Sequence, residues 1–158
     1  MTNRSRATAG LLLLLASAVP SVARAQIPDS TIPLQTVISE TNRFRAEYAD
    51  YFNKKDIAGL MTLYAADAIF TAEGGTRYTG QEEIKAYFTA MAATMPHIVV
   101  TSENLLSYGA TAIDMGTITM HPPAGGEVKS RYLAVLRRER GGAGNWDLVR
   151  VVRTPVAK

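Results

Sequence analysis

The sequence predicts an α+β protein in which three helices cover one face of a curved antiparallel sheet and enclose a pocket. Two observations support this fold class. Up to residue 95 apolar side chains recur with helical spacing, whereas from residue 97 onward they alternate with a period of two. Amphipathic helices that precede a sheet must bury their apolar stripes against one of its faces.

The first 25 residues have the three parts of a secretory signal peptide. Arg4 and Arg6 precede an apolar run over residues 11–19, and Ala23-Arg24-Ala25 has the small-x-small pattern of a cleavage site. The apolar run is too short to cross a bilayer. We therefore expect cleavage before Gln26 and a secreted or periplasmic mature protein with no membrane attachment, the alternative being an uncleaved anchor.

The charge balance changes when this segment is set aside. The chain has 17 Lys and Arg against 14 Asp and Glu, and three of the arginines lie in residues 1–25, which leaves 14 basic against 14 acidic residues. A nearly neutral domain gives no support for a nucleic-acid partner. The sequence has no Cys, so the core, with or without a dimer, must supply the stability.

Three segments have helical patterns after a flexible leader at residues 26–33. Pro33 suits the first turn of a long helix, Asp56 suits the N-cap of a short one, and Thr79 with Glu82 forms a capping-box signature for the third. Met95-Pro96 ends the third helix. The apolar stripe of the first helix consists of Leu34, Val37, Ile38, Thr41, Phe44, Tyr48 and Phe52. The folded domain therefore covers residues 34–158.

Strand patterns fill the rest of the domain. Residues 68–71 predict a brief strand before the turn Glu73-Gly74-Gly75-Thr76, and residues 97–107, 111–121, 128–138 and 146–153 predict four longer strands. The short connections between these four strands predict an antiparallel meander. Arg137, Arg138 and Arg140 cluster beside Gly141-Gly142-Ala143-Gly144, as is typical of a solvated hairpin tip.

Several motifs in this order support a family resemblance over about residues 34–153. They are Phe52-Asn53-Lys54-Lys55-Asp56, Leu63-Tyr64-Ala65-Ala66-Asp67-Ala68, Tyr78-Thr79-Gly80-Gln81-Glu82-Glu83-Ile84, Asp114-Met115-Gly116-Thr117, and Arg131-Tyr132-Leu133 with Trp146. The chain resembles the nuclear transport factor 2-like or SnoaL-like superfamily, also called cystatin-like, and more closely its SgcJ/EcaC-type branch. The resemblance implies a cone-shaped domain and a homodimer formed through the outer face of the sheet. Its motifs specify the fold better than the chemistry.

Ketosteroid isomerases of this superfamily use a carboxylate base and an oxyanion hole made of a tyrosine and a protonated aspartate. The resemblance places Tyr48 at the oxyanion tyrosine, but it places Ala72 at the base and Ala134 at the second donor. Glu73 adjoins the base position, yet neighbouring strand residues point to opposite faces. It could replace the base only if a bulge near Gly74 redirected it.

Asp114 and Tyr48 are the candidate catalytic residues. Strand alternation puts Asp114 on the same face as Ala112, Gly116 and Ile118, where it is either an acid or base in the pocket or a solvated residue on the outer face. Tyr48 lies on the apolar stripe of the first helix, so its hydroxyl faces a cavity or bonds a neighbouring backbone group.

The candidate ligand-binding residues are Tyr48, Phe52, Tyr64, Tyr132 and Arg153. The arginine could offer its planar fork to a carboxylate or an enolate, or it could form a salt bridge at the end of the sheet.

Other kinds of site lack a motif. His97 and His121 flank strands 24 residues apart without a metal-ligand spacing, so we expect no metal, and no cofactor. No Gly-x-Ser-x-Gly, phosphate-loop or dinucleotide motif is present. Trp146 suits the core or a dimer interface.

These observations favour an exported domain that binds a small, largely apolar molecule inside the cone. One alternative is an isomerase- or cyclase-like enzyme that transfers protons at carbon, with Asp114 as acid or base and Tyr48 as oxyanion donor. The other is a non-catalytic dimeric module for protein interactions.

Overall fold

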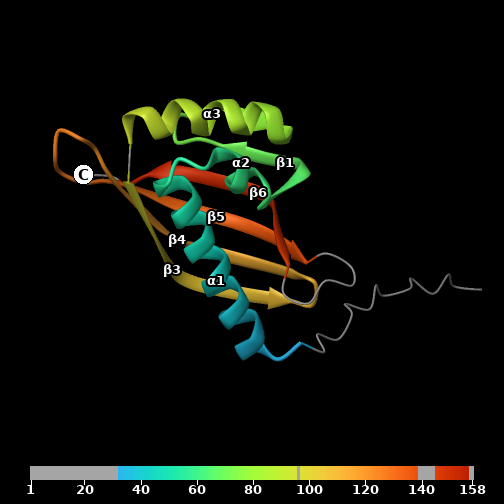
Figure 1. Ribbon diagram of the computed structural model, residues 1–158. Helices are drawn as coiled ribbons and strands as arrows, with labels where there is room; N and C mark the ends of the chain where they lie inside the picture. The colour runs from blue at the N-terminus through green and yellow to red at the C-terminus, as the bar shows by residue number, and fades with distance from the viewer. Residues whose placement is uncertain (1–31, 96, 139–144, 157–158) are drawn as a thin grey trace, which may run out of the picture.

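The computed structural model describes residues 32–95, 97–138 and 145–156, and it shows helices packed on one face of a six-stranded sheet (Figure 1). The predicted signal peptide lies outside the described residues, as does Arg140. The elements in chain order are α1 (Leu34–Asn53), α2 (Ile57–Met61), β1 (Tyr64–Thr71), β2 (Arg77–Thr79), α3 (Gly80–Thr94), β3 (His97–Tyr108), β4 (Thr111–His121), β5 (Val128–Arg138) and β6 (Trp146–Pro155).

The strand order across the sheet is β2-β1-β6-β5-β4-β3. The predicted antiparallel meander is confirmed for β3 to β6, with register pairs such as Asp114 opposite Ala134. The expectation of a wholly antiparallel sheet behind three N-terminal helices was wrong, because β1 pairs in parallel with β6 and two strands precede α3. Alternation marks a strand but carries no information about the direction of its partner.

The two predicted helix caps differ in outcome. The Asp56 side chain accepts a hydrogen bond from the Gly59 N–H over 2.8 Å, as predicted for the start of α2. The prediction of a capping box between Thr79 and Glu82 at the start of α3 was wrong. Glu83 rather than Glu82 accepts from the Thr79 N–H, over 2.7 Å, and the Thr79 side chain makes no capping bond.

The core lies between the helices and the concave face of the sheet. Helix α1 packs against β3 and α3 packs against β1 (Figure 1). Aromatic rings of α1, α3 and β1 meet around Phe88, which contacts Tyr48, Phe52, Tyr64 and Phe70. Trp146 was predicted to lie in the core or in a dimer interface, and it is buried in this core.

No helix in the described part of the chain is long and apolar enough to span a membrane.

Strand β4 alternates strictly between buried and partly exposed residues. Its buried residues are Ala112, Asp114, Gly116, Ile118 and Met120. Asp114 therefore shares a face with Ala112, Gly116 and Ile118, as predicted, and this is the face that the helices cover. The pocket-facing alternative for Asp114 is the observed one.

Gly116 leaves no room for a side chain, because a Cβ there would lie 1.9 Å from the Thr101 carbonyl oxygen of β3. Replacing Gly116 by Ala should force the two strands apart and lower the free energy of unfolding by about 1–3 kcal/mol, measured by urea denaturation. Gly74→Ala is the matched control, since a Cβ there meets nothing within 4 Å. Equal stability of the two variants would contradict this close approach.

Candidate binding cavity

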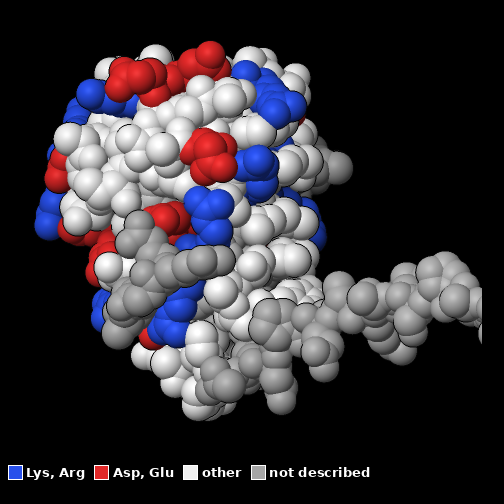
Figure 2. Space-filling model, turned by 90° about the vertical axis from the view of Figure 1, so that its right-hand side faces the viewer, with Lys and Arg blue, Asp and Glu red and all other residues white. Residues whose placement is uncertain are grey.

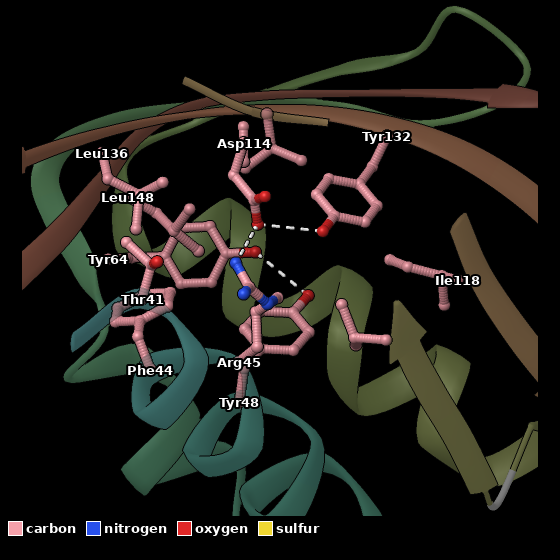
Figure 3. Close-up of a pocket in the computed structure, with 13 residues that line it drawn as sticks. Thr41, Phe44, Arg45, Tyr48, Tyr64, Asp114, Ile118, Tyr132, Leu136 and Leu148 are labelled. Carbon is pink, nitrogen blue, oxygen red and sulfur yellow. Dashed lines mark hydrogen bonds and ion pairs between the residues drawn. The ribbon is translucent and has the colours of Figure 1, made fainter. Parts of the chain in front are cut away.

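A cavity of about 40 Å³ lies between α1 and the concave face of the sheet (Figure 3). This volume has room for two or three water molecules. Its walls are mostly apolar and come from α1, β1 and the four meander strands. The lining residues are Thr41, Phe44, Arg45, Tyr48, Tyr64, Val100, Asp114, Ile118, Tyr132, Ala134, Leu136, Leu148 and Val151.

The polar centre of the cavity is the Asp114 carboxylate, which is only 3% exposed. Its Oδ2 accepts hydrogen bonds from Arg45 Nη1 over 2.8 Å and from the Tyr132 hydroxyl over 2.9 Å, and its Oδ1 accepts one from Ser102 Oγ over 2.5 Å. The contact with Arg45 is also an ion pair. A carboxylate offers about four acceptor positions, so three donors leave about one of them unused.

Three different elements bring these donors to Asp114. Arg45 extends from α1 toward the sheet, and Tyr132 extends from the neighbouring strand β5 (Figure 3). Ser102 lies at a register shift in β3, where the pairing moves between Ser102 and Asn104. A bulge of this kind redirects a side chain, and here it accompanies the contact of the Ser102 hydroxyl with the carboxylate.

Two tyrosines form a second polar pair in the same cavity. The hydroxyl oxygens of Tyr48 and Tyr64 lie 3.3 Å apart (Figure 3). Burial raises the pKa of both phenols, most strongly that of Tyr64. Burial, together with the adjacent Asp114 carboxylate, also raises the pKa of Tyr132. These hydroxyls therefore stay protonated at neutral pH and can donate hydrogen bonds.

Arg153 occupies a different position on the concave face. It is 2% exposed and its Nη2 lies 2.6 Å from Glu73 Oε1 in an ion pair, while Ser130 Oγ donates to the same Glu73 oxygen over 2.6 Å. The salt-bridge alternative for Arg153 is therefore the observed arrangement. Glu73 follows the end of β1 in the turn closed by the Gly75 N–H to Ala72 C=O bond.

The structure brings most of the predicted site residues together. Tyr48, Tyr64, Asp114 and Tyr132 line the cavity, whereas Phe52 is fully buried in the aromatic core beside Phe88 and does not line it. The predictions missed two donors, Arg45 and Ser102. A signal for Arg45 was present, since it follows Thr41 by four residues and precedes Tyr48 by three, on the same side of α1.

The two histidines face each other across β3 and β4, with ring centroids 5.5 Å apart. Within residues 32–95, 97–138 and 145–156 no group of three His, Cys, Asp or Glu side chains is placed to hold a metal ion.

The fold and the cavity between helix and sheet define the class of protein. The profile of the SnoaL-like domain family matches residues 44–143. The chain therefore belongs to the SnoaL-like family, which the sequence motifs indicated. No curated protein matches the chain at a significant level.

Solved structures with this fold include a ketosteroid isomerase-like protein from Erwinia carotovora atroseptica, at 17% identity and a TM-score of 0.64, covering 79% of this chain and 97% of that one. An NTF2-like protein from Cytophaga hutchinsonii has 17% identity and a TM-score of 0.63, covering 79% and 100%. A domain of unknown function with a cystatin-like fold from Nostoc punctiforme has 18% identity and a TM-score of 0.64, covering 76% and 79%. At these identities the similarity shows the fold alone.

Removing the Asp114 carboxylate should cost stability, because it leaves the Arg45 guanidinium largely buried and unpaired. We expect Asp114→Ala to lower the free energy of unfolding by about 3 kcal/mol in urea denaturation. Asp50→Ala is the matched control, since its pair with Lys54 is exposed to solvent and should contribute little to stability. Similar losses in the two variants would show that the Asp114 network does not stabilise the fold.

The raised pKa values of Tyr48, Tyr64 and Tyr132 predict that stability falls in alkaline solution. Above pH 10 the unfolded chain loses phenol protons at the ordinary pKa of 10.0, whereas the folded protein keeps them. The unfolded state then binds fewer protons, so the free energy of unfolding decreases as the pH rises. Urea denaturation at pH 8 and pH 11 measures this, and Tyr132→Phe should reduce the slope. A Tyr132→Phe slope equal to the wild-type slope would contradict the assignment.

Proposed function

We propose that this SnoaL-like domain binds a small, largely apolar molecule with one polar group in the cavity between α1 and the sheet. The observation that supports this is the convergence of apolar walls on one polar cluster, formed by Asp114, Arg45 and Tyr132. Sites for small molecules combine these two features, an apolar surface and a few placed polar groups that orient the ligand.

Arg45 is the residue that would open this cavity. It lines the inner cavity and also a surface groove of about 510 Å³ between α1 and β3, so its side chain lies between the two spaces. The cavity of about 40 Å³ is far smaller than the several hundred Å³ of a typical ligand site. A ligand would enter from the groove as Arg45 moves aside, and the cavity would expand toward α1.

The polar groups limit the chemistry of the ligand. The remaining acceptor position of Asp114 suits a hydroxyl or amine donor. The Tyr132 hydroxyl already donates to Asp114, whereas the Tyr48 and Tyr64 hydroxyls share one hydrogen bond, so one of their two protons can be donated to an oxygen of the ligand. A hydroxylated apolar molecule, such as a steroid-like or polyketide-like compound, would satisfy both, because a hydroxyl donates and accepts.

The enzyme alternative is proton transfer at carbon with Asp114 as acid or base. Two observations favour binding over this alternative. Ala72 and Ala134 place no polar side chain at two of the three positions that ketosteroid isomerases use, and three protein donors already occupy the Asp114 carboxylate. An enzyme working here would need a substrate that displaces at least one of these donors.

A thermal-shift screen of purified mature protein against steroid-like, polyketide-like and lipid-like compounds tests the binding proposal. Ligand at a hundredfold its Kd should add about 2.7 kcal/mol to the free energy of unfolding. Ala134→Leu places extra volume in the cavity and should abolish the shift, whereas Ala86→Leu, the same substitution at an exposed position of α3, should not. No stabilisation by any compound, or an unchanged shift in Ala134→Leu, would overturn the proposal.

We also propose a homodimer formed through the outer face of the sheet. Exposed apolar side chains gather there on neighbouring strands, with Leu133 of β5 opposite Val152 of β6, and Val99 and Leu106 on β3. On the face seen in Figure 2, acidic and basic side chains are interspersed, with no extended patch of one sign. Sedimentation should give the mass of two chains at micromolar concentration, and Leu133→Lys should give one. A wild-type mass of one chain would exclude the dimer.

Export rests on the N-terminal sequence pattern alone, and we propose that the mature protein is periplasmic or secreted. The N-terminal sequence of the protein recovered from its natural host should begin at Gln26. Recovery of the intact N-terminus in the cytoplasmic fraction would contradict export.

The finer assignment to the SgcJ/EcaC-type branch stays a prediction.

A further inference from the structure

A second pocket, distinct from the Asp114 cavity, opens between α3 and the concave face of the sheet. Its volume is about 420 Å³, and its lining includes Tyr87, Met91, Met95, Met120, Glu73 and Arg153. It lies further along the same strands, since Met120 follows Ile118 of the first cavity by two residues on β4, and Arg153 follows Val151 by two on β6. Residues two apart on a strand share a face.

The guanidinium of Arg153 is buried beside this pocket with much of its donor capacity unused. A guanidinium carries five N–H donors. Nη2 contacts Glu73 Oε1 at 2.6 Å, Ser130 Oγ at 3.1 Å and the Met120 sulfur at 3.2 Å. Among the residues that the structure describes, Nη1 contacts only the Met91 sulfur, at 3.5 Å, and the buried Nε has no hydrogen-bond partner. Thioether sulfurs are weak acceptors, so a single oxygen, Glu73 Oε1, provides most of the stabilisation of the buried Arg153 charge.

Glu73 is placed so that another carboxylate could replace it. Its side chain is 26% exposed, and it follows the end of β1 beside Gly74 and Gly75, which carry no side chains. Its Oε1 binds Arg153 through Nη2 alone, so the two-bond fork of a paired Arg and carboxylate is not formed. A carboxylate that bonds both Nε and Nη2 would satisfy the buried donor that Glu73 leaves unpaired.

We propose that this second pocket binds a small carboxylic acid with a flexible apolar chain, whose carboxylate displaces Glu73 from Arg153. The single buried guanidinium supplies the charge that recognises a monoanion, and its planar fork matches a carboxylate. Met91, Met95 and Met120 supply an adaptable apolar surface for the chain, because methionine side chains fit many shapes. A pocket of about 420 Å³ lies within the range of small-molecule sites.

Titration calorimetry with octanoate, and with octanol as the uncharged probe of the same length, tests this proposal on the mature protein. Octanoate should bind and octanol should bind at least tenfold more weakly. Glu73→Gln removes the competing carboxylate and should strengthen octanoate binding about tenfold. Arg153→Lys keeps the charge but not the fork, and in the Glu73→Gln background it should weaken binding at least tenfold.

Arg150→Met is the matched control, since it removes an exposed arginine from the same strand and should leave the octanoate affinity unchanged. Three results would overturn the proposal: no octanoate binding to wild type or Glu73→Gln, equal binding of octanol, or an affinity that Glu73→Gln lowers. If Arg153→Lys fails to fold, the comparison of Glu73→Gln with wild type still tests the proposal. Stronger octanoate binding by Glu73→Gln shows that Glu73 competes with octanoate for Arg153, and weaker binding shows that Glu73 contributes to octanoate binding. The Ala134→Leu variant, which fills the first cavity, should retain octanoate binding, so failure at one site is separable from failure at the other.

Discussion

The concave face of the sheet buries two side chains of opposite charge, and each needs a counterion that the sheet itself does not supply. Asp114 on β4 is paired by Arg45 from α1, and Arg153 on β6 is paired by Glu73 from the turn after β1. Removing one partner of a buried pair costs several kcal/mol, because it leaves a desolvated charge alone. These two pairs connect α1 to the meander and the turn after β1 to β6.

Strand alternation puts the two charges on the same face of the sheet, and the strand register sets their relative positions. Arg153 lies opposite Tyr132, which lies opposite Gly116, so Arg153 is two strands across and two residues along from Asp114. Aromatic and aliphatic side chains occupy the space between them, among them Tyr48, Tyr64 and Ile118. The concave face thus has two chemically different ends. One is a small cavity around a carboxylate, and the other is a wider pocket beside a guanidinium.

The cavity also shows how a shared fold can carry a different set of polar groups. Asp114 lies directly opposite Ala134 in the pairing of β4 with β5, so its carboxylate is at the same level of the sheet as the position where the family resemblance predicted a second donor. The carboxylate is displaced by one strand, and Arg45 and Ser102 bind it there. Membership of the SnoaL-like family therefore describes the scaffold, while the chemistry depends on which strand bears the polar side chain.

The sequence by itself determined the helices, the four meander strands, the cap at Asp56 and which residues share a face with Asp114. These features depend on the 3.6- and 2-residue periods and on contacts between residues a few positions apart, which are local and can be read directly. It also placed Tyr48, Tyr64 and Tyr132 among the site residues.

Only the tertiary structure decided the parallel pairing of β1 with β6, the counterions of the two buried charges, and the place of Phe52 in the core instead of the cavity wall. Arg45 and Asp114 are 69 residues apart, and no periodic pattern links such positions. Their contact results from how α1 lies across the sheet, which is set by side-chain packing over the whole core.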